Sequence, residues 1–171
     1  MIRCERHEDE AEISRVIDAA FGDRETSAFA EQIRASPGYV PELAFVVEEE
    51  GEIVAHTMLS WVRLEGPEVA VLTLTPMSVR PDRQRQGIGR ALVEAVLAAA
   101  DEAGEPLVLV EGVPSYYPQF GFVSATGSGL ERPDPRIPEA AWMVRPLRAY
   151  DPALRGRVVY PPFFPGPPAD A

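Results

Sequence analysis

The segment between residues 69 and 110 restricts the possible folds more than any other part of the chain. It begins with Val69–Val79, which reads as a strand that Pro81 ends. From Ile88 to Gly104 the apolar residues recur every three or four positions, as in an amphipathic helix. Leu107–Val110 is then an uninterrupted apolar run, typical of a strand buried on both faces. This succession predicts a crossover to a parallel neighbouring strand, and therefore an α/β fold.

The residues before this segment predict two helices and a hairpin. Apolar residues at helical spacing over Asp9–Phe21 and Thr26–Ala35 indicate the helices. Leu43–Val47 and Ile53–Leu64 read as two strands joined by a polar turn, so we expect them to pair as a hairpin. After the crossover, Ala140–Leu147 is expected to be the last strand.

The length of 171 residues favours a single domain. We expect the main domain to cover residues 1–150 and a proline-rich extension to cover 151–171, since ten of the 18 prolines occur from Pro133 onward. The proline run over 161–168 excludes a regular helix or a central strand there. This extension either packs on the domain through its aromatic residues or trails from it as an arm.

Composition excludes several classes of protein. The net charge of −11 argues against a general binder of nucleic acids or anionic membranes, which would need a dominant basic surface. All 16 cationic residues are arginine. A single cysteine, Cys4, excludes a disulfide framework, and only two histidines are present, so we expect no metal site. No apolar run reaches the length of a membrane span, and the N-terminus lacks the apolar core of a secretion signal. The expected compartment is the cytoplasm.

The turn between the predicted strand and helix has the composition of a phosphate site. Gly87 and Gly89 allow backbone N–H groups to approach a ligand, and the first turn of a helix has N–H groups without internal partners. Four arginines within 11 residues add positive charge, namely Arg80, Arg83, Arg85 and Arg90. A Walker A loop is excluded because the chain has no lysine, and a Rossmann fingerprint would need a glycine where Leu92 stands. The glycine pair alone is also compatible with an ordinary tight turn.

Three stretches together resemble one family. Gln84-Arg85-Gln86-Gly87-Ile88-Gly89 resembles the Gln/Arg-x-x-Gly-x-Gly/Ala signature of the GNAT superfamily of acetyl-CoA-dependent N-acetyltransferases. Pro76–Pro81 is similar to the bulged fourth strand of that family and its exit, and Tyr116–Phe122 to its Tyr-x-x-x-Gly-Phe element. The Tyr-Tyr pair and the C-terminal residues are most similar to the YhbS-like branch. The resemblance covers most of the chain and is strongest over Leu72–Phe122.

The resemblance implies a fold and a donor site. It implies a mixed central sheet of about six or seven strands with flanking helices and a splayed, bulged fourth strand. It also implies that acetyl-CoA binds, with its acetyl and pantetheine arm on the backbone of the fourth strand and its pyrophosphate on the signature loop. The residues implied are Met77, Ser78, Val79, Gln84, Arg85, Gln86, Gly87, Ile88, Gly89 and Arg90.

Acyl transfer to an amine needs a donor to the oxyanion, a neutral amine and help for the leaving thiolate. A backbone N–H near Ser78 or Val79 is the candidate for the oxyanion, and Tyr117 is the candidate general acid because it precedes Gly121-Phe122 at the family spacing. The general base stays open between Glu111, His56 and ordered water. Glu111 can equally be an exposed carboxylate at the end of a strand, and His56 can be a packed core histidine. For both residues we favour this structural interpretation over a catalytic role.

Two functions of different kinds follow from these patterns. The first is an N-acetyltransferase that acts on a primary amine in a ternary complex, and the acceptor stays open between a small amine, a peptide N-terminus and a protein lysine. The second is a non-catalytic module that binds an acyl-CoA on the same fold as a sensor or interaction domain. Residues 1–52 carry 14 acidic and 5 cationic residues, which would suit a cationic acceptor or simply form a solvated face. The sequence is silent on oligomeric state, and the resemblance allows a homodimer.

Overall fold

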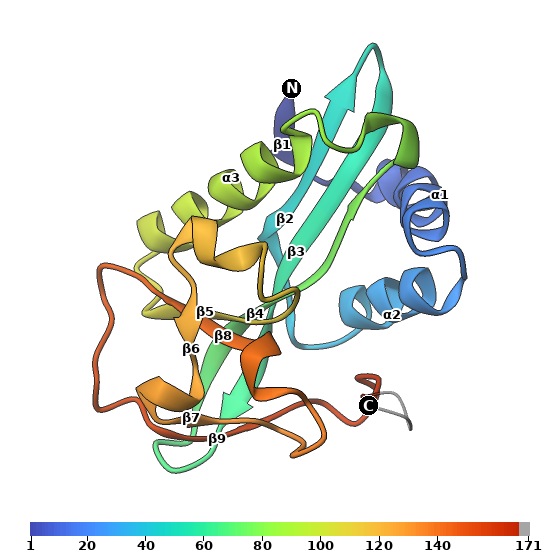
Figure 1. The fold of residues 1–171 in the computed structure, drawn as a ribbon. Coiled ribbons are helices and arrows are strands. Elements are labelled where there is room, and N and C mark those ends of the chain that lie inside the picture. The colour runs from blue at the N-terminus through green and yellow to red at the C-terminus, as the bar shows by residue number, and fades with distance from the viewer. Residues whose placement is uncertain (168–171) are drawn as a thin grey trace. The chain divides into compact units, whose positions relative to one another are not determined.

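The computed structural model describes residues 1–167, which form helices and strands in the order shown in Figure 1. The three α-helices are α1 (Glu10–Phe21), α2 (Glu25–Arg34) and α3 (Ile88–Glu102). The strands are β1 (Ile2–Cys4), β2 (Tyr39–Glu49), β3 (Glu52–Leu64), β4 (Val69–Val79), β5 (Leu107–Glu111), β6 (Val123–Ser124), β7 (Leu130–Glu131), β8 (Trp142–Pro146) and β9 (Gly156–Val159). A 3₁₀ turn, η3 (Tyr117–Phe120), follows β5.

The chain forms two compact units. The first consists of Met1–Ser60 and Leu74–Ala100, and the second begins with Trp61–Thr73 and resumes at Asp101. Strands β3 and β4 each contribute one end to each unit.

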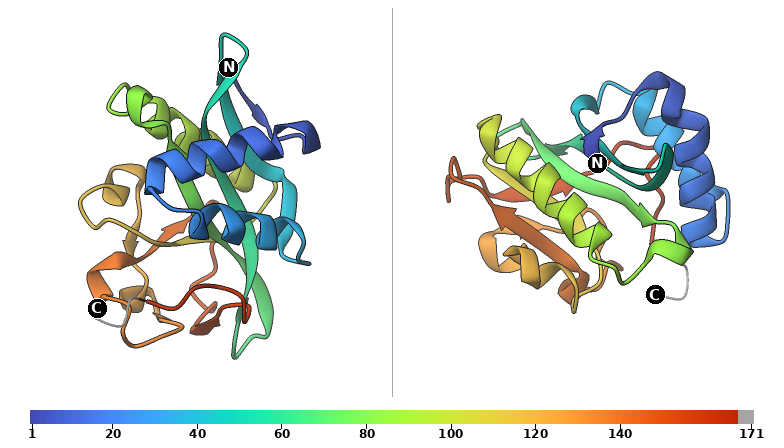
Figure 2. Two further views of the ribbon diagram at one scale, coloured as in Figure 1. Left: turned by 90° about the vertical axis from the view of Figure 1, so that its right-hand side faces the viewer. Right: turned by 90° about the horizontal axis from the view of Figure 1, so that it is seen from above.

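In the first unit, β1, β2 and β3 pair antiparallel, and β2 and β3 form the predicted hairpin. Helices α1 and α2 cover one face of these strands and α3 covers the other (Figures 1 and 2). On the α3 side, Leu92 packs with Val47, Val54 and Ala55 in a buried apolar cluster. The two helical faces therefore enclose the strands that lead into β4.

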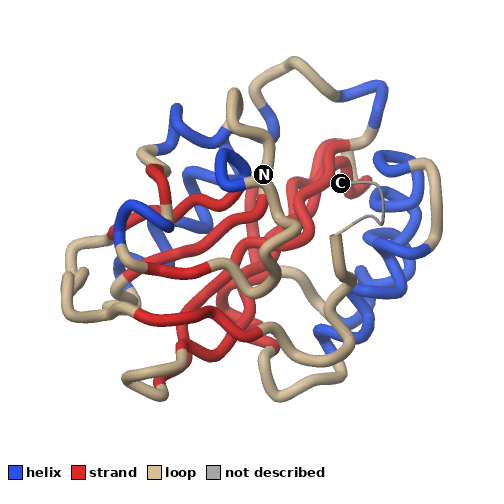
Figure 3. The backbone as a smooth tube through the Cα atoms, turned by 60° about the horizontal axis from the view of Figure 1, so that its bottom comes forward, coloured by secondary structure: helices blue, strands red, loops and turns tan. Residues whose placement is uncertain are grey.

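In the second unit, β5 is the central strand. It pairs parallel with β4 at Leu72 and Thr73, and antiparallel with β8 along its whole length. Strand β9 pairs with β3 at Arg63 and Leu64, and β7 pairs with β9. Figure 3 shows how loops connect the helices and strands along the backbone. A buried cluster that includes Leu109, Trp142 and Val158 forms its core.

The strand order β1-β2-β3-β4-β5-β8-β6, with β7 and β9 beside it, is a mixed sheet with flanking helices, as predicted. Seven of the strands lie on this path, and β7 and β9 extend the sheet. The parallel pairing of β4 with β5 confirms the predicted crossover connection. The expectation that Ala140–Leu147 holds the last strand is wrong, because β9 follows β8. Strand β9 begins at Gly156 and has only four residues, which are too few to show an apolar period in the sequence.

The C-terminal segment contacts the core of the second unit through two aromatic residues. Tyr160 and Phe164 contact the core cluster around Trp142, and their rings lie 4.8 Å apart. This contact agrees with the packed alternative for the proline-rich segment. The proposed division of the chain at residue 150 stays a prediction, and residues 168–171 lie outside the described residues.

Candidate active site

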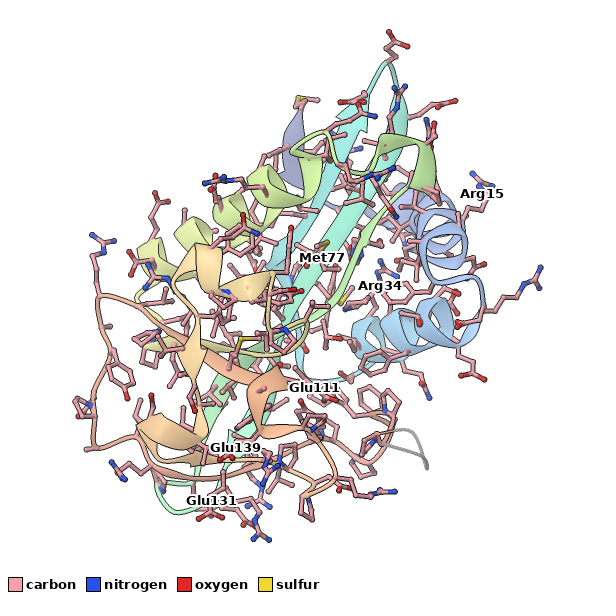
Figure 4. The ribbon with its side chains drawn as sticks, in the orientation of Figure 1. Arg15, Arg34, Met77, Glu111, Glu131 and Glu139 are labelled. Atoms are coloured by element: carbon pink, nitrogen blue, oxygen red, sulfur yellow. The ribbon has the colours of Figure 1, made fainter. Side chains whose placement is uncertain are left out.

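The end of β4 carries three of the predicted site residues. Ser78 is buried and its Oγ lies 3.5 Å from the His56 carbonyl oxygen on β3, while Met77 and Val79 on either side are half-buried. Thr57 of β3 donates a hydrogen bond to the Pro76 carbonyl at 3.1 Å. Hydroxyl contacts with β3 therefore fix this part of the strand (Met77 is labelled in Figure 4).

The predicted signature forms an exposed loop between β4 and α3. Gln84 donates from Nε2 to the Val79 carbonyl at 3.0 Å, which ties the loop to the last residue of β4. Gln86 donates from Nε2 to the Asp82 carbonyl at 3.1 Å. Arg85 adopts a positive φ of 60°, and Gly87 one of 84°. The two glutamine side chains thus shape the loop, and they do so by bonding to its own backbone.

Helix α3 begins directly after this loop. The first helical bond runs from the Ala91 N–H to the Gly87 carbonyl at 3.0 Å, so the N–H groups of Ile88, Gly89 and Arg90 have no partner inside the helix. The first turn holds no acidic residue. A Cβ atom at Gly87 would meet nothing within 4 Å. The positive end of the helix is therefore open to an anion.

The arginines of this region divide into paired and unpaired groups. Arg80 is held by Glu52 and Asp82 at 2.8 and 2.7 Å. Arg83 lies 3.6 Å from Glu49, and Arg90 lies 3.0 Å from Glu94 one turn later in α3. Arg85 is exposed and forms no ion pair with any residue in 1–167. Among these four arginines, Arg85 is therefore the one whose positive charge is not balanced by a carboxylate within residues 1–167.

Tyr117 belongs to the second unit, where it is the first residue of η3, the 3₁₀ turn after β5. It is 8% exposed and packs edge-on against Tyr116 and Phe122, with ring centroids 5.2 and 5.4 Å away. A Cβ atom at Gly112 would lie only 2.6 Å from Cδ2 of the Tyr117 ring, so the glycine makes room for it. Burial, with a smaller effect of Tyr116, raises the pKa of Tyr117 to about 12.

Glu111 ends β5 and is the neighbour of Gly112. Its carboxylate accepts a hydrogen bond from the Tyr160 hydroxyl at 3.4 Å. Desolvation by the surrounding groups raises the pKa of Glu111, although part of the residue is exposed and the Tyr160 hydrogen bond acts in the opposite direction. No sequence pattern indicates this contact, because Tyr160 lies 49 residues away in a proline-rich segment.

His56 is fully buried in the first unit, as the packed reading predicted. Its Nε2 lies 2.8 Å from Oε2 of Glu5, which also pairs with Arg34 and accepts a hydrogen bond from Tyr39 at 2.7 Å. Burial lowers the pKa of His56, so the ring is neutral and donates from Nε2 to Glu5. Arg34 reaches this group from the end of α2 (Figure 4). His56 is therefore part of a buried polar cluster with Glu5, Arg34 and Tyr39.

Among residues 1–167, no group of three or more His, Cys, Asp or Glu side chains could hold a metal ion. Nor is any helix in this part of the chain both long and apolar enough to cross a membrane.

Comparison with known proteins decides the family. The model of the "Acetyltransferase (GNAT) domain" family matches residues 1–125. The chain belongs to the GNAT acetyltransferase family. The Escherichia coli K12 protein called "Uncharacterized N-acetyltransferase YjhQ" is 29% identical over 156 residues, which cover 88% of this chain and 86% of the relative.

Two solved GNAT structures have the same fold. YhbS from Escherichia coli, solved with CoA, is 25% identical with a TM-score of 0.86, covering 95% of this chain and 90% of that one. A GNAT acetyltransferase from Brucella melitensis, solved with acetyl-CoA, is 29% identical with a TM-score of 0.79, covering 96% and 97%. These comparisons confirm the predicted family, its YhbS-like branch, the fold and the enzyme class, and the two solved structures hold the predicted cofactor, as CoA in one and acetyl-CoA in the other.

Proposed function

We propose that this GNAT enzyme transfers the acetyl group of acetyl-CoA to a primary amine by direct attack in a ternary complex. One observation carries the proposal, namely the exposed Gln84–Gly87 loop that presents the free N–H groups of α3. The relatives with CoA and acetyl-CoA support it. The non-catalytic alternative gains no such support, since the curated relatives are named N-acetyltransferases.

The residues of the first unit fit a polyanionic donor. A pyrophosphate suits an unobstructed helix N-terminus without acidic side chains, next to the unpaired Arg85. Acetyl-CoA supplies an activated thioester, whose carbonyl carbon an amine can attack. We assign the donor to the backbone and side chains of Met77, Ser78, Val79, Gln84, Arg85, Gln86, Gly87, Ile88, Gly89 and Arg90.

Tyr117 is the proposed general acid, and it acts through a hydrogen bond. Its pKa of about 12 exceeds that of a thiol, about 8.5, so complete proton transfer to a thiolate would be uphill by about 5 kcal/mol. A hydrogen bond to the departing sulfur gains stabilisation without that cost. A backbone N–H of Ser78 or Val79 is the proposed donor to the oxyanion.

The proposed acceptor is a primary amine on a small molecule or a peptide. The excess of acidic residues in positions 1–52 favours acceptors with additional positive charge through long-range attraction.

The first experiment measures the thermal midpoint with acetyl-CoA, with CoA and with ATP. A ligand at about 100 times its Kd stabilises the folded state by about 2.7 kcal/mol. We expect a clear rise with acetyl-CoA and none with ATP, followed by CoA release when primary amines are added. No rise at millimolar acetyl-CoA would remove the basis of the proposal.

A further inference from the structure

A side chain of β3 bonds to the backbone of β4 at Pro76. Proline has no backbone N–H, so its carbonyl is the one backbone group with which it can bond to a neighbouring strand. The Thr57 hydroxyl donates to this carbonyl at 3.1 Å, inside the protein. Thr57 is 0% exposed, so water does not compete for the bond. The Thr57 hydroxyl therefore holds the Pro76 carbonyl toward β3.

The direction of this carbonyl also fixes the direction of the next N–H group. The peptide between Pro76 and Met77 is trans, and in a planar trans peptide the carbonyl and the following N–H point in opposite directions. Since the Pro76 carbonyl faces β3, the Met77 N–H faces away from β3. Met77 is half-buried and is the first of the last three residues of β4 (Figure 4).

The alternation of the strand extends this direction to Val79. Successive residues of a strand direct their backbone groups to opposite edges. The Arg80 N–H donates to a carbonyl of β3 at 2.8 Å, so Arg80 faces β3 just as Pro76 does four residues earlier. Ser78 lies midway between these two residues and also faces β3. The N–H groups of Met77 and Val79 therefore both face away from β3.

One side chain holds each end of this short segment. At its far end the Val79 carbonyl accepts a hydrogen bond from Nε2 of Gln84 at 3.0 Å, in agreement with a Val79 backbone that faces away from β3. At its near end the Thr57 hydroxyl holds the carbonyl of Pro76. The backbone donors of Met77 and Val79 are thus oriented before any ligand binds.

Acetyl transfer needs such oriented donors. When the amine nitrogen bonds to the acetyl carbon, negative charge collects on the thioester oxygen, and it leaves that oxygen when the C–S bond breaks. N–H groups that already point at this oxygen stabilise the charge without having to turn during the reaction. We propose that Thr57 is a positioning residue for acetyl transfer, because its bond to the Pro76 carbonyl keeps these N–H groups of β4 directed at the thioester oxygen.

This inference rests on the proposed function and adds to it a residue of β3. Thr57 is buried and does not touch the substrate, so its effect passes through the backbone of β4. Of the two donors proposed for the oxyanion, the alternation selects Val79, because the Ser78 N–H faces β3. The sequence analysis did not single out Thr57, since only the pairing of β3 with β4 brings its hydroxyl to Pro76.

Infrared spectroscopy of bound acetyl-CoA tests the inference without an acceptor. The thioester carbonyl is labelled with a heavy carbon isotope, which separates its band from those of the protein, and a hydrogen bond to its oxygen lowers the stretching frequency. We expect a lower frequency on the native protein than in solution. Thr57→Val keeps the shape of the side chain but loses the hydroxyl, and should remove most of this shift. Thr57→Ser keeps the hydroxyl and should retain it.

Thr73→Val is the matched control. Thr73 is 1% exposed on β4, and its hydroxyl donates to the Leu109 carbonyl of the neighbouring strand at 3.4 Å. Each of the two valine variants loses one buried hydroxyl bonded to a strand carbonyl, so both should lower the thermal midpoint by a similar amount, about 2–6 °C. The carbonyl band should move in Thr57→Val alone.

Turnover gives a second readout. CoA release is followed with acetyl-CoA and three probe amines, a polyamine, free lysine and a short peptide with a free α-amine. Thr57→Val should lower kcat about tenfold or more, because loss of an oxyanion donor costs about 100-fold or more and these donors are misdirected rather than removed. The affinity for acetyl-CoA should stay within about threefold, since the Gln84–Gly89 loop is unchanged. Thr57→Ser should recover most of kcat, and Thr73→Val should stay within about twofold.

The outcomes separate this inference from the function on which it rests. A carbonyl band that is the same in the native protein and in Thr57→Val, or equal losses of kcat in the two valine variants, would overturn the positioning role and leave the function intact. If Thr57→Val does not fold, Thr57→Cys takes its place against Thr57→Ser, because a thiol of similar size is a weak donor, and equal bands in these two would again overturn it. If acetyl-CoA does not raise the thermal midpoint of the native protein, the function and this inference both fall.

Discussion

The ring of Tyr117 lies against the backbone of Gly112, and a Cβ atom at residue 112 would come within 2.6 Å of its Cδ2. No side chain larger than hydrogen fits there without displacing the ring. The position of the proposed general acid therefore depends on a glycine five residues earlier.

Gly112→Ala should push the Tyr117 ring out of its place. Overpacking of this kind costs about 1–3 kcal/mol, and each kcal/mol lowers the thermal midpoint of a chain this size by about 2–4 °C. We also expect a lower kcat at saturating substrates. Gly127→Ala is the control, since its Cβ would meet Ser124 at an ordinary 3.4 Å. Equal behaviour of the two variants would show that the ring adapts to the extra atom.

Tyr117→Phe should lower kcat by about tenfold or more while acetyl-CoA still raises the thermal midpoint. The ring and its packing remain, and only the hydroxyl that would bond to the departing sulfur is lost. Steady-state CoA release with the probe amines measures the effect, and Tyr116→Phe is the neighbouring control. An unchanged kcat would remove Tyr117 from the mechanism.

Gly87→Ala should weaken acetyl-CoA binding about tenfold or more, because a methyl group would stand where the loop presents its backbone to the phosphate. Gly104→Ala is a close control. Its φ of 82° matches the 84° of Gly87, and a Cβ at either position would meet nothing within 4 Å. Both variants should therefore lose similar stability, about 1 kcal/mol, while calorimetric titration of acetyl-CoA distinguishes them. Equal affinities would argue against the loop as the pyrophosphate site.

The interior pair of His56 and Glu5 should make stability depend on pH. Burial holds the pKa of His56 below its usual value of about 6.5, so below that pH the unfolded chain binds a proton that the folded chain does not. Stability due to His56 is then complete above about pH 6.5 and falls as the pH decreases. Glu5 adds to the loss below about pH 4.3, because the hydrogen bonds from His56 and Arg34 outweigh desolvation and lower its pKa.

His56→Gln keeps an N–H donor for Glu5 but cannot titrate, so the decrease in unfolding free energy between pH 7 and 5 should become shallower. Urea unfolding at several pH values measures this. His7→Gln is the control, because the hydrogen bond to Glu10 raises the pKa of the exposed His7 and gives a contribution of the opposite sign. A slope in His56→Gln equal to that of the native protein would show that folding does not lower the pKa of His56.

Much of the fold could be predicted from local patterns. Strand β4 has the predicted bounds Val69–Val79, α3 begins at the predicted Ile88, and Gly22 ends α1 in the left-handed conformation expected of a terminal glycine. Periodicity and glycine placement act over a few residues, so the sequence records them directly. The same holds for the Gln84–Gly89 loop, whose site role rests on backbone groups next to one another in the chain.

What lies outside such patterns depends on contacts between distant residues. The sequence left Glu111 and His56 open as bases, since nothing near either residue shows its surroundings. Tertiary structure brings Tyr160 to Glu111 across 49 residues and Glu5 to His56 across 51. Desolvation raises the pKa of Glu111 and lowers the pKa of His56, and the hydrogen bonds with Tyr160 and Glu5 oppose these two shifts. The sequence by itself thus determined the family, the crossover and the loop, because local backbone geometry encodes them. Only the tertiary structure decided the protonation and accessibility of the acid–base groups, because desolvation and hydrogen bonding arise when remote segments pack together.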